Sequence, residues 1–586
     1  MNNLKRLWNY LPKRRHKQVW ILFVLMNVAT FAEVISIGMV IPFLAVITDP
    51  ELVYKYELIQ PLIQFFDLKM AIQIVLPLTI VFIITIFIAG VVRLLLLYVM
   101  TRLSFAAGSD ISVDIYRKTL YQKYSVHMDR NSSELINSIS RKSSASIGVM
   151  RSFLTIISST IMLIGIMLAL FAISLKIALT MFFGFGLIYF AVISLTRNKL
   201  KKNGQLIADK STLMIKSLQE GLGGIRDVLI DGSQQFYSRL YRNADYKLRI
   251  ADGDNAVISG SPRFIIEAIG LILIVIIAYF MTNNGSTAAI PIIGAFAFGA
   301  QRLLPAVQQA YGAYTNILGS QASLEDVLEL LDQELPAHLD QPIPLPISFN
   351  KNIELKNLGF HHSKSTSLLL KNINLSFVKG SRIGFIGTTG IGKSTLLDVI
   401  MGLLDPTEGS MMIDGQDIND ENKRSWQMHI AHVPQHVFLS DGSIEENIAF
   451  GVSKEEIDYE RVKRVAKQAK ILDLVSKQSY GQKNIIGERG VRLSGGQRQR
   501  VGIARALYKQ ADVLVFDEAT SALDDSTERD IMNEIKELGG DLTIFIIAHR
   551  VTTLKICDQI IKLEANNIIS SGSYQEIIGD RKAKEK

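Results

Sequence analysis

Cysteine is almost absent from this sequence, which has a single one, Cys557, among its 586 residues. One cysteine cannot form an internal disulfide, and because Cys557 lies in a polar segment we interpret it as an unreactive structural thiol. The sequence is also poorer in polar residues than a soluble chain of this length would be, since 48% of the residues are hydrophobic and the mean hydropathy is +0.24. Membrane residence is therefore the first expectation, and the length predicts several domains.

Charged residues are scarce in six apolar runs of the first half. Each run is long enough to cross a bilayer, which takes roughly 20 helical residues. The first run follows a basic leader, but it is too long for a signal peptide and lacks a small-residue cleavage site, so we expect it to be retained. We predict an α-helical membrane domain over residues 1–320, with six transmembrane spans at about 19–47, 72–100, 153–173, 175–195, 264–282 and 286–306.

Lysine and arginine are distributed unevenly around these runs. Two long loops, at about 101–152 and 197–263, carry eight and twelve of them, whereas the opposite side has only Lys55, Lys69 and Lys176. By the positive-inside rule, the N-terminus, both loops and everything after the sixth span lie in the cytoplasm. This distribution accounts for much of the net charge of +8, so we expect no nucleic-acid partner.

Prolines crowd the junction between the two halves of the chain. Pro336, Pro342, Pro344 and Pro346 lie too close together for a helix interior, and we interpret residues 321–349 as a linker. Short β-type runs then alternate with helical ones, which is typical of an α/β domain with a mainly parallel sheet. This domain is predicted to cover residues 350–580, followed by a tail at 581–586.

The segment SRIGFIGTTGIGKSTLLDVI combines an apolar strand, a glycine-rich loop and the start of a helix. In such a P-loop the backbone N–H groups point at phosphates, and the helix N-terminus adds its positive dipole end. Lys393 is expected to reach the β- and γ-phosphates of ATP, and the Ser394 hydroxyl to ligate Mg²⁺. The candidate ATP contacts of this loop are Gly387, Thr388, Thr389, Gly390, Ile391, Gly392, Lys393, Ser394 and Thr395.

A second buried strand, Val513–Phe516, ends in Asp517 and Glu518. Asp517 is placed to hold Mg²⁺, directly or through water, and Glu518 is the candidate general base for the attacking water. An acidic pair after a strand is often only a helix cap, but the glycine-rich loop upstream favours the catalytic interpretation.

Further on, LSGGQRQR offers a second helix N-terminus, at Ser494, Gly495 and Gly496, suited to the γ-phosphate of a different ATP.

Residues 350–580 resemble the nucleotide-binding domain of ATP-binding cassette (ABC) proteins, motif by motif and in the same order. The resemblance implies that Gln435 in HVPQ senses Mg²⁺ and the attacking water, that LSGGQ is the family signature, that Asp524 in SALD belongs to the D-loop, and that His549 in IAHR is catalytic as the switch histidine. It also implies that two cassettes dock head to tail around ATP, so that a second half-transporter is required. An identical chain would be sufficient.

Two positions depart from the family pattern, and one of them is Ile485 in NIIGERG, at a site that is often acidic. The adenine usually stacks on an aromatic residue some thirty residues before the loop lysine, and this chain has His362 there, in FHHS. Imidazole also stacks but buries less area, which predicts an altered nucleotide affinity or pH response.

Six spans followed by one cassette resemble an ABC exporter half-transporter. The first span and its exit, EVISIGMVIPFLAVITDP, with the amphipathic segment that follows, resemble those of bacterial lipid-linked oligosaccharide flippases of the inner membrane. The family's short transverse helices are expected near Ser125–Asn131 and Gly232–Phe236. On this resemblance the cargo is a polyprenyl-pyrophosphate-linked glycan. The alternatives are another amphipathic cargo (a lipid, a drug or a peptide) or, in a different class, an ATP-gated channel or regulator.

Three arginines in or beside the spans are candidate substrate contacts, because guanidinium groups bind pyrophosphate bidentately. A charge in hydrocarbon is costly unless it faces water or a partner. Alternatives remain open at this point: Arg93 would snorkel to the interface, and Arg263 would pair with Glu267 one turn away. Arg302 has the least obvious route to water, and Glu33 would either pair across helices or mark the path.

Overall fold

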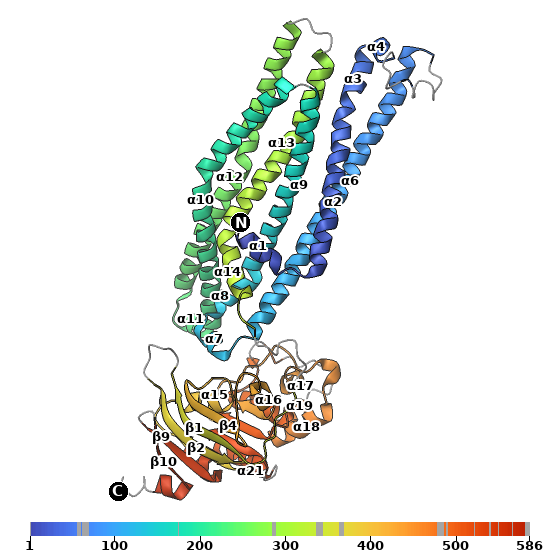
Figure 1. Ribbon diagram of the computed structural model, residues 1–586. Coiled ribbons are helices and arrows are strands. Elements are labelled where there is room, and N and C mark those ends of the chain that lie inside the picture. The colour runs from blue at the N-terminus through green and yellow to red at the C-terminus, as the bar shows by residue number, and fades with distance from the viewer. Residues whose placement is uncertain are drawn as a thin grey trace. The chain divides into compact units, whose positions relative to one another are not determined.

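The computed structural model divides the chain into two compact units (Figure 1). One unit comprises residues 1–121 and 130–334, and the other comprises residues 122–129 and 335–586. The structure describes residues 2–54, 60, 69–173, 175–283, 289–335, 344–361, 368–476, 486–487, 490–520, 522–537, 541–548, 550–564 and 567–579.

Long helices build the first unit, and each predicted span falls on one or two of them. Three segments in the described part of the chain are long and apolar enough to cross a membrane: Lys13–Thr48, Ala71–Leu120 and Ser132–Ala172. The spans predicted at 175–195 and 264–282 lie within α10 and α12. Residues 289–306 of the last predicted span lie within α13, and its first three residues fall outside the described part of the chain. The long helices are α2 (Lys13–Gly38), α3 (Val40–Thr48), α6 (Val75–Leu120), α9 (Ser143–Ile173), α10 (Leu175–Gly223), α12 (Gln234–Asn283) and α13 (Ala289–Gly319).

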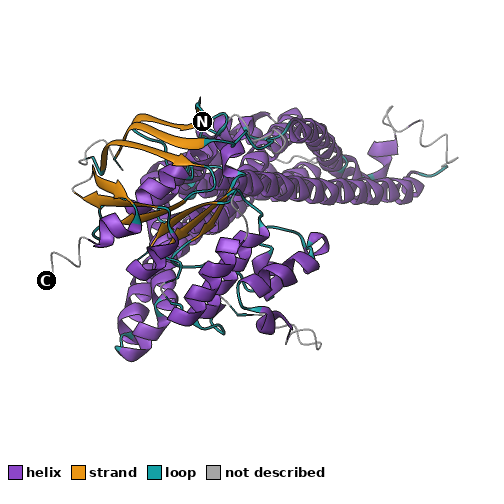
Figure 2. Ribbon diagram, turned by 90° about the horizontal axis from the view of Figure 1, so that it is seen from below, coloured by secondary structure: helices purple, strands orange, loops and turns teal. Residues whose placement is uncertain are grey.

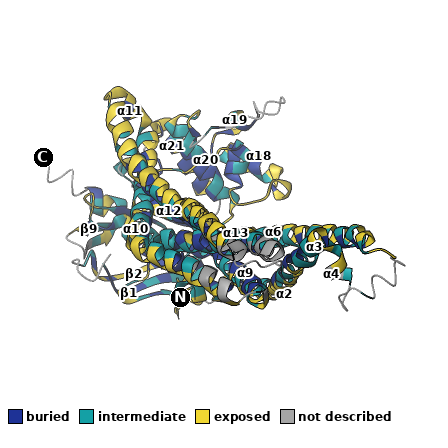
Figure 3. Ribbon diagram, turned by 90° about the horizontal axis from the view of Figure 1, so that it is seen from above, coloured by how far each residue is buried: buried dark blue, intermediate teal, exposed yellow. Residues whose placement is uncertain are grey.

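The first span is interrupted at Met39, between α2 and α3. Pro42 explains this break, because proline has no N–H to donate to the carbonyl of Gly38. Large apolar side chains point outward from the long helices, among them Phe31, Phe87 and Leu195. In Figure 3 such exposed positions run along α10 and α12. An apolar exterior of this extent is expected of helices that face lipid.

Short helices complete the first unit. The N-terminal helix α1 packs against α14, where Asn3 donates to Glu325 at 2.9 Å while Arg6 and Tyr10 both contact Asp332. Helix α14 thus occupies the first part of the segment that was interpreted as a linker. The short helices are α1 (Asn2–Asn9), α4 (Pro50–Tyr54), η2 (Ala71–Ile74), α8 (Ser132–Asn137), η3 (Ser138–Lys142), α11 (Ile225–Ile230) and α14 (Gln321–Leu331).

The second unit contains two sheets (Figure 2). The larger has the strand order β10-β9-β3-β8-β7-β6, with parallel pairing throughout except between β10 and β9. The smaller sheet, β2-β1-β4-β5, is antiparallel. The strands are β1 (Asn352–Phe360), β2 (Leu370–Val378), β3 (Arg382–Ile386), β4 (Glu408–Ile413), β5 (Gln416–Asp417), β6 (Ile430–Val433), β7 (Val513–Asp517), β8 (Thr543–Ile547), β9 (Gln559–Glu564) and β10 (Asn567–Gly572).

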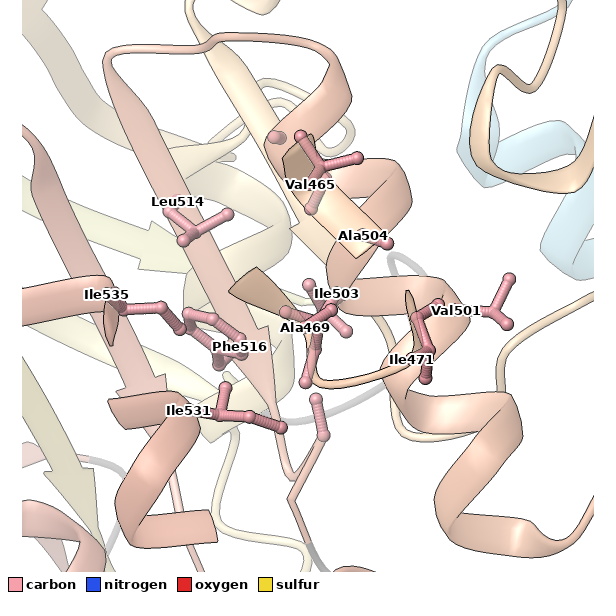
Figure 4. Close-up of a cluster of buried hydrophobic side chains, with 14 of the residues drawn as sticks. Val465, Ala469, Ile471, Val501, Ile503, Ala504, Leu514, Phe516, Ile531 and Ile535 are labelled. Carbon is pink, nitrogen blue, oxygen red and sulfur yellow. The ribbon is translucent and has the colours of Figure 1, made fainter. Parts of the chain in front are cut away.

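Hydrophobic packing covers both faces of the larger sheet. Along β7, Val513 and Val515 join one cluster while Leu514 and Phe516 join the other, as the two-residue period of a strand requires. Figure 4 shows Leu514 and Phe516 in the second of these clusters. The helices of this unit are α7 (Tyr124–Asp129), α15 (Lys393–Ile400), α16 (Lys423–Gln427), α17 (Ile444–Ile448), η4 (Lys454–Glu456), α18 (Tyr459–Gln468), α19 (Leu472–Ser476), α20 (Gly495–Tyr508), α21 (Asp525–Glu537), η6 (Val551–Ile556) and η7 (Gln575–Gly579).

Candidate nucleotide-binding site

The predicted phosphate loop connects the end of β3 to the start of α15. Gly390 and Gly392 have φ angles of +84° and +101°, which glycine adopts without the strain other residues would incur. At Gly387 a Cβ would lie 2.6 Å from the carbonyl oxygen of Leu563, so no side chain fits there. Lys393 folds back over the loop and donates to the carbonyl oxygens of Gly387 and Thr388, at 2.9 and 3.0 Å. The loop therefore has the tight backbone curl that phosphate binding needs.

Ser394 and Asp517 meet beside this loop. The Ser394 hydroxyl donates to Asp517 Oδ1 at 3.3 Å, and burial together with the charge of Glu518 raises the pKa of Asp517. A hydroxyl and a carboxylate are oxygen ligands of the kind Mg²⁺ prefers, and this ion usually keeps waters and takes phosphate oxygens for its other positions. The donor set fits Mg²⁺ bound together with a nucleotide.

Glu518 has an unusual backbone conformation. Its φ is +51°, a left-handed value that costs a non-glycine residue about 1–3 kcal/mol and that clusters at functional sites. Its N–H donates to the carbonyl of Ile547 at 3.0 Å, so the end of β8 fixes this turn. Gln435, two residues beyond β6, donates its side-chain amide to Glu518 Oε2 at 2.6 Å. The carboxyl ends of β6 and β7 thus bring Gln435, Asp517 and Glu518 to one edge of the sheet, and the end of β8 holds the Glu518 backbone there.

The signature turn forms the N-terminus of α20. Ser494 is the N-cap: its hydroxyl accepts the N–H of Gln497 at 3.2 Å, and its own N–H donates to the Gln497 side chain at 2.8 Å. Gly495 and Gly496 come next and pack against Ala522 of the D-loop segment, where a Cβ on Gly496 would lie 3.1 Å from the Ala522 carbonyl oxygen. The turn is therefore a rigid, capped helix end with its small residues next to the D-loop.

Asp524, which was expected to contact ATP, forms hydrogen bonds with residues that follow it closely in the sequence. Its carboxylate accepts hydrogen bonds from the Ser526 hydroxyl and, at 2.9 Å, from the Thr527 N–H, which hold its pKa well below the usual range. It therefore caps the start of α21. The other two predicted contacts outside the loop, His362 and His549, lie outside the described residues.

Two charged residues near the site were missed by sequence reasoning. Asp398 lies one helical turn beyond Ser394 on α15, and burial, with a smaller contribution from Asp517, raises its pKa to about 6. Arg550 contacts Asp525 and, at 3.2 Å, the buried carboxylate of Glu528 on α21. Helical spacing from Ser394 was an available signal for Asp398, whereas the partners of Arg550 are set by the fold.

The three candidate substrate arginines have different surroundings. Arg302 on α13 pairs with Glu33 on α2, with Nε and Oε1 3.0 Å apart, although the geometry falls outside that of a hydrogen bond. Glu33 is 2% exposed and the Arg302 side chain 25%, with the Phe298 ring 5.3 Å from the guanidinium carbon. Arg263 pairs with Glu267, with Nε and Oε2 3.8 Å apart. Arg93 on α6 takes part in neither of these two ion pairs, and its side chain is partly exposed.

Comparison with known proteins agrees with this architecture. Residues 19–293 match the family model described as the ABC transporter transmembrane region, and residues 370–521 match the family model described as ABC transporter. The chain is 22% identical to a structure described as a bacterial Atm1-family ABC exporter with ATP bound; the match covers 97% of this chain and 96% of that one, with a TM-score of 0.76.

Curated relatives include the heterocyst differentiation ATP-binding protein HepA of Nostoc sp., 32% identical over 62% of this chain and 59% of its own length. ATP-dependent lipid A-core flippases are also similar: that of Cupriavidus pinatubonensis is 25% identical over 84% of this chain and 83% of its own, and that of Francisella tularensis 29% over 72% and 70%.

A helical transmembrane domain followed by one α/β P-loop cassette defines the exporter type of ABC half-transporter, and this chain belongs to the ABC transporter family. It is a multi-pass membrane protein that binds ATP and couples its hydrolysis to export, and half-transporters of this kind work as dimers. The predicted fold class and family are confirmed.

Proposed function

We propose that this chain forms a homodimer that moves a polyprenyl-pyrophosphate-linked oligosaccharide across a bacterial inner membrane. Its N-terminus and cassette would both lie in the cytoplasm, as the distribution of lysine and arginine predicts. Membership of the family supports ATP-driven export, and the similarity to ATP-dependent lipid A-core flippases supports a lipid as cargo.

In the cassette we assign Lys393 and the loop N–H groups to the β- and γ-phosphates of ATP. Mg²⁺, held by Ser394 and Asp517, would neutralise the negative charge that develops on the phosphate oxygens. Glu518 orients the attacking water and accepts its proton, and the amide of Gln435 holds the Glu518 carboxylate in place. His549 keeps its predicted role at the γ-phosphate, His362 at the adenine and Asp524 in the D-loop.

The second chain is needed because the signature turn forms a separate phosphate-binding end. Ser494, Gly495 and Gly496 present the N-terminus of α20, and the side-chain cap leaves further first-turn N–H groups for a ligand. We assign this end to the ATP held by the partner cassette. Every catalytic motif on the chain is intact, so two identical chains suffice.

The position of Arg302 is the main support for the proposed cargo. It stands in the sixth predicted span beside a buried glutamate, and a quarter of its side chain is exposed. Burying a charge within a membrane is expensive, so intramembrane charges usually mark a substrate path. A guanidinium has five N–H donors, and the contact through Nε leaves the terminal nitrogens able to bind a pyrophosphate headgroup. Arg93 and Arg263 would line the same path.

A reconstituted flipping assay tests this cargo. Liposomes receive fluorescent polyprenyl-pyrophosphate glycans, lipid A or phosphatidylethanolamine, and Arg302→Ala should lower flipping of the pyrophosphate lipids about tenfold, as loss of a charge-assisted contact predicts. Arg302→Ala also leaves the buried carboxylate of Glu33 without its partner, which could impair folding. The double variant Glu33→Gln/Arg302→Gln removes both charges, so a loss of flipping in it reports lost recognition and not an unpaired charge. Arg249→Ala, which breaks an exposed pair with Asp245, is the matched control. Unchanged flipping of every glycolipid by both Arg302 variants rules out the anion site.

Lipid A or another amphipathic molecule is the second candidate, favoured by the names of the relatives. Strong flipping of lipid A without any dependence on Arg302 would select it. An ATP-gated channel or regulator would instead conduct ions in the same liposomes without moving any of the lipids.

A further inference from the structure

A polar cavity lies inside the first unit, where α10, α12 and α13 run side by side (Figure 1). Residues of η3, α9 and α14 complete its wall. Its volume is about 380 Å³, within the range of about 300–1,000 Å³ that small-molecule sites have. Every lining residue belongs to the segments that the distribution of lysine and arginine places in the cytoplasm, and none belongs to the nucleotide site or to the three candidate substrate arginines.

Two asparagine side chains line the polar cavity in fixed orientations. Oδ1 of Asn255 on α12 accepts a hydrogen bond from Nδ2 of Asn203 at 2.8 Å. Asn316 on α13 donates its Nδ2 group to the Ser152 hydroxyl, also at 2.8 Å. The Nδ2 group of Asn255 has no hydrogen-bond acceptor among the described residues, and Oδ1 of Asn316 meets only the Ser320 hydroxyl, at 3.5 Å. One amide therefore offers donors to a ligand and the other offers an acceptor.

A buried hydroxyl also faces the polar cavity. Ser323 is 6% exposed and lines the cavity from α14, yet its side chain has no hydrogen-bond partner in the described part of the chain. Buried polar side-chain atoms nearly always have a partner, so we expect this hydroxyl to bind something within the cavity.

Charges at the polar cavity are already compensated. The Arg141 guanidinium lies 3.8 Å from the Asp252 carboxylate, and Lys142, whose side chain is 5% exposed, is paired with Asp326. A phosphate or a metal ion would disturb one of these pairs, whereas a neutral ligand would not. Ile207 is the only large apolar side chain among the described residues that line the cavity, so a lipid tail finds little to bind there. Amides, hydroxyls and paired charges suit a neutral molecule rich in hydroxyl groups, which is the chemistry of a sugar.

We propose that the polar cavity binds a sugar unit of the glycan that the cargo carries. This inference rests on the proposed function for the source of that sugar. Gly312, which lines the cavity, follows Arg302 on α13 by ten residues, and this spacing is about 15 Å of helix. A pyrophosphate at Arg302 joins the polyprenyl tail to the sugars, so the tail stays in the bilayer while the sugars extend toward the cytoplasm and the cavity.

A variant that fills the polar cavity tests this. Ala256 lines the cavity from α12 and carries no polar group, so Ala256→Leu takes up space without removing a hydrogen bond. Flipping in liposomes is compared for fluorescent polyprenyl pyrophosphate that is bare or that carries an oligosaccharide of glucose, galactose or N-acetylglucosamine. The rate for the preferred glycan lipid, divided by the rate for the bare lipid, should fall about tenfold in Ala256→Leu, as loss of the hydrogen bonds to one sugar predicts.

Two matched variants control for the added volume. Val257→Leu changes the next position of α12, where the side chain is exposed and does not line the polar cavity, and it should leave the ratio of rates unchanged. Ala256→Ser changes the lining position but leaves the cavity open, so it should also keep the ratio.

Direct binding is measured with the same three oligosaccharides free of lipid. The single native cysteine is buried, so the thiol introduced by Ser320→Cys at the cavity wall is the one that a water-soluble maleimide reaches. At least one free oligosaccharide should slow the alkylation of Ser320→Cys several-fold. None should slow that of Lys463→Cys on α18, where the lysine side chain is exposed.

The outcomes separate the sugar site from the proposed cargo. An unchanged ratio of rates in Ala256→Leu overturns the site, and so does alkylation of Ser320→Cys that no oligosaccharide slows, since the polar cavity then holds only water. If the unmodified protein flips no pyrophosphate lipid while a free oligosaccharide still slows alkylation, the proposed cargo is wrong and the cavity is a site for a free sugar.

Discussion

Glu518 shows how strongly a single residue is constrained at this site. Its left-handed backbone is held by the carbonyl of Ile547, while its side chain is held by Gln435. The residue that would accept a proton from water is therefore held at its backbone by the end of β8 and at its side chain by the segment after β6. Such pre-positioning lowers the reorganisation needed when the carboxylate takes a proton from the attacking water.

Glu518→Gln should retain ATP binding but lose steady-state hydrolysis by about 100-fold or more, since an amide cannot act as the general base. The hydrogen bond to Gln435 remains possible, so the fold around the site is preserved. Binding is measured with a fluorescent ATP analogue and hydrolysis by phosphate release. Glu460→Gln on α18, whose carboxylate is exposed, is the matched control. Normal turnover in Glu518→Gln would remove this residue from the mechanism.

At the scale of elements, the N-terminus of α20 is capped by a side chain and is also the proposed binding site for a phosphate. Ser494 and Gln497 satisfy one another in a capping box, and the same arrangement occurs in α17 between Ser443 and Glu446. The two helices therefore offer a matched pair of caps, of which only one is assigned to a phosphate.

Ser494→Ala and Ser443→Ala should each destabilise the cassette by about 1 kcal/mol, as loss of a serine cap does. Only Ser494→Ala should also strongly lower the ATP hydrolysis of the dimer, and Ser494→Thr, which restores a capping hydroxyl, should recover part of it. Thermal unfolding and phosphate release measure the two effects. Equal hydrolysis by both alanine variants would leave the signature turn with a structural role alone.

Elements encoded by local sequence were predictable, and those defined by distant partners were not. The phosphate loop, Asp517 and the parallel sheet follow from short patterns of glycine, charge and β-branched residues. The antiparallel sheet of β1, β2, β4 and β5 has no such local mark, because its pairing joins Asn352–Phe360 to Glu408–Ile413 across the intervening P-loop. Helix α14 was assigned to the linker since its apolar face becomes evident only when it packs against α1, α6 and α9.

Arginine pairing is a second case in which the sequence left alternatives open. The spacing of Arg263 and Glu267 allowed the pair that the structure contains. Glu33 and Arg302 stand on different helices, so no periodicity connects them, and only the packing of α2 beside α13 brings the two charges together.

At the scale of the whole molecule, head-to-tail pairing of cassettes can be tested with dimers formed from two different variant chains. Lys393→Ala and Ser494→Ala should each be nearly inactive alone, because every ATP site carries a defect. In a mixed dimer both defects fall in the same site and the other site is intact. Co-expressed chains with different affinity tags, purified through both, should therefore hydrolyse more ATP than either parent. Mixed dimers no more active than the parents would contradict the assignment of the signature to the partner's ATP.

The pair between Glu33 and Arg302 also bears on how the protein is made. Arg302 follows Glu33 by 269 residues, so at ordinary rates of synthesis the ribosome needs on the order of tens of seconds to supply the second charge. During that interval the first hydrophobic segment enters the bilayer with a carboxyl group that has no arginine beside it, at a cost of about 3 kcal/mol for a central charge. Biogenesis therefore depends on the surrounding leucines and isoleucines to retain the segment until its late partner arrives.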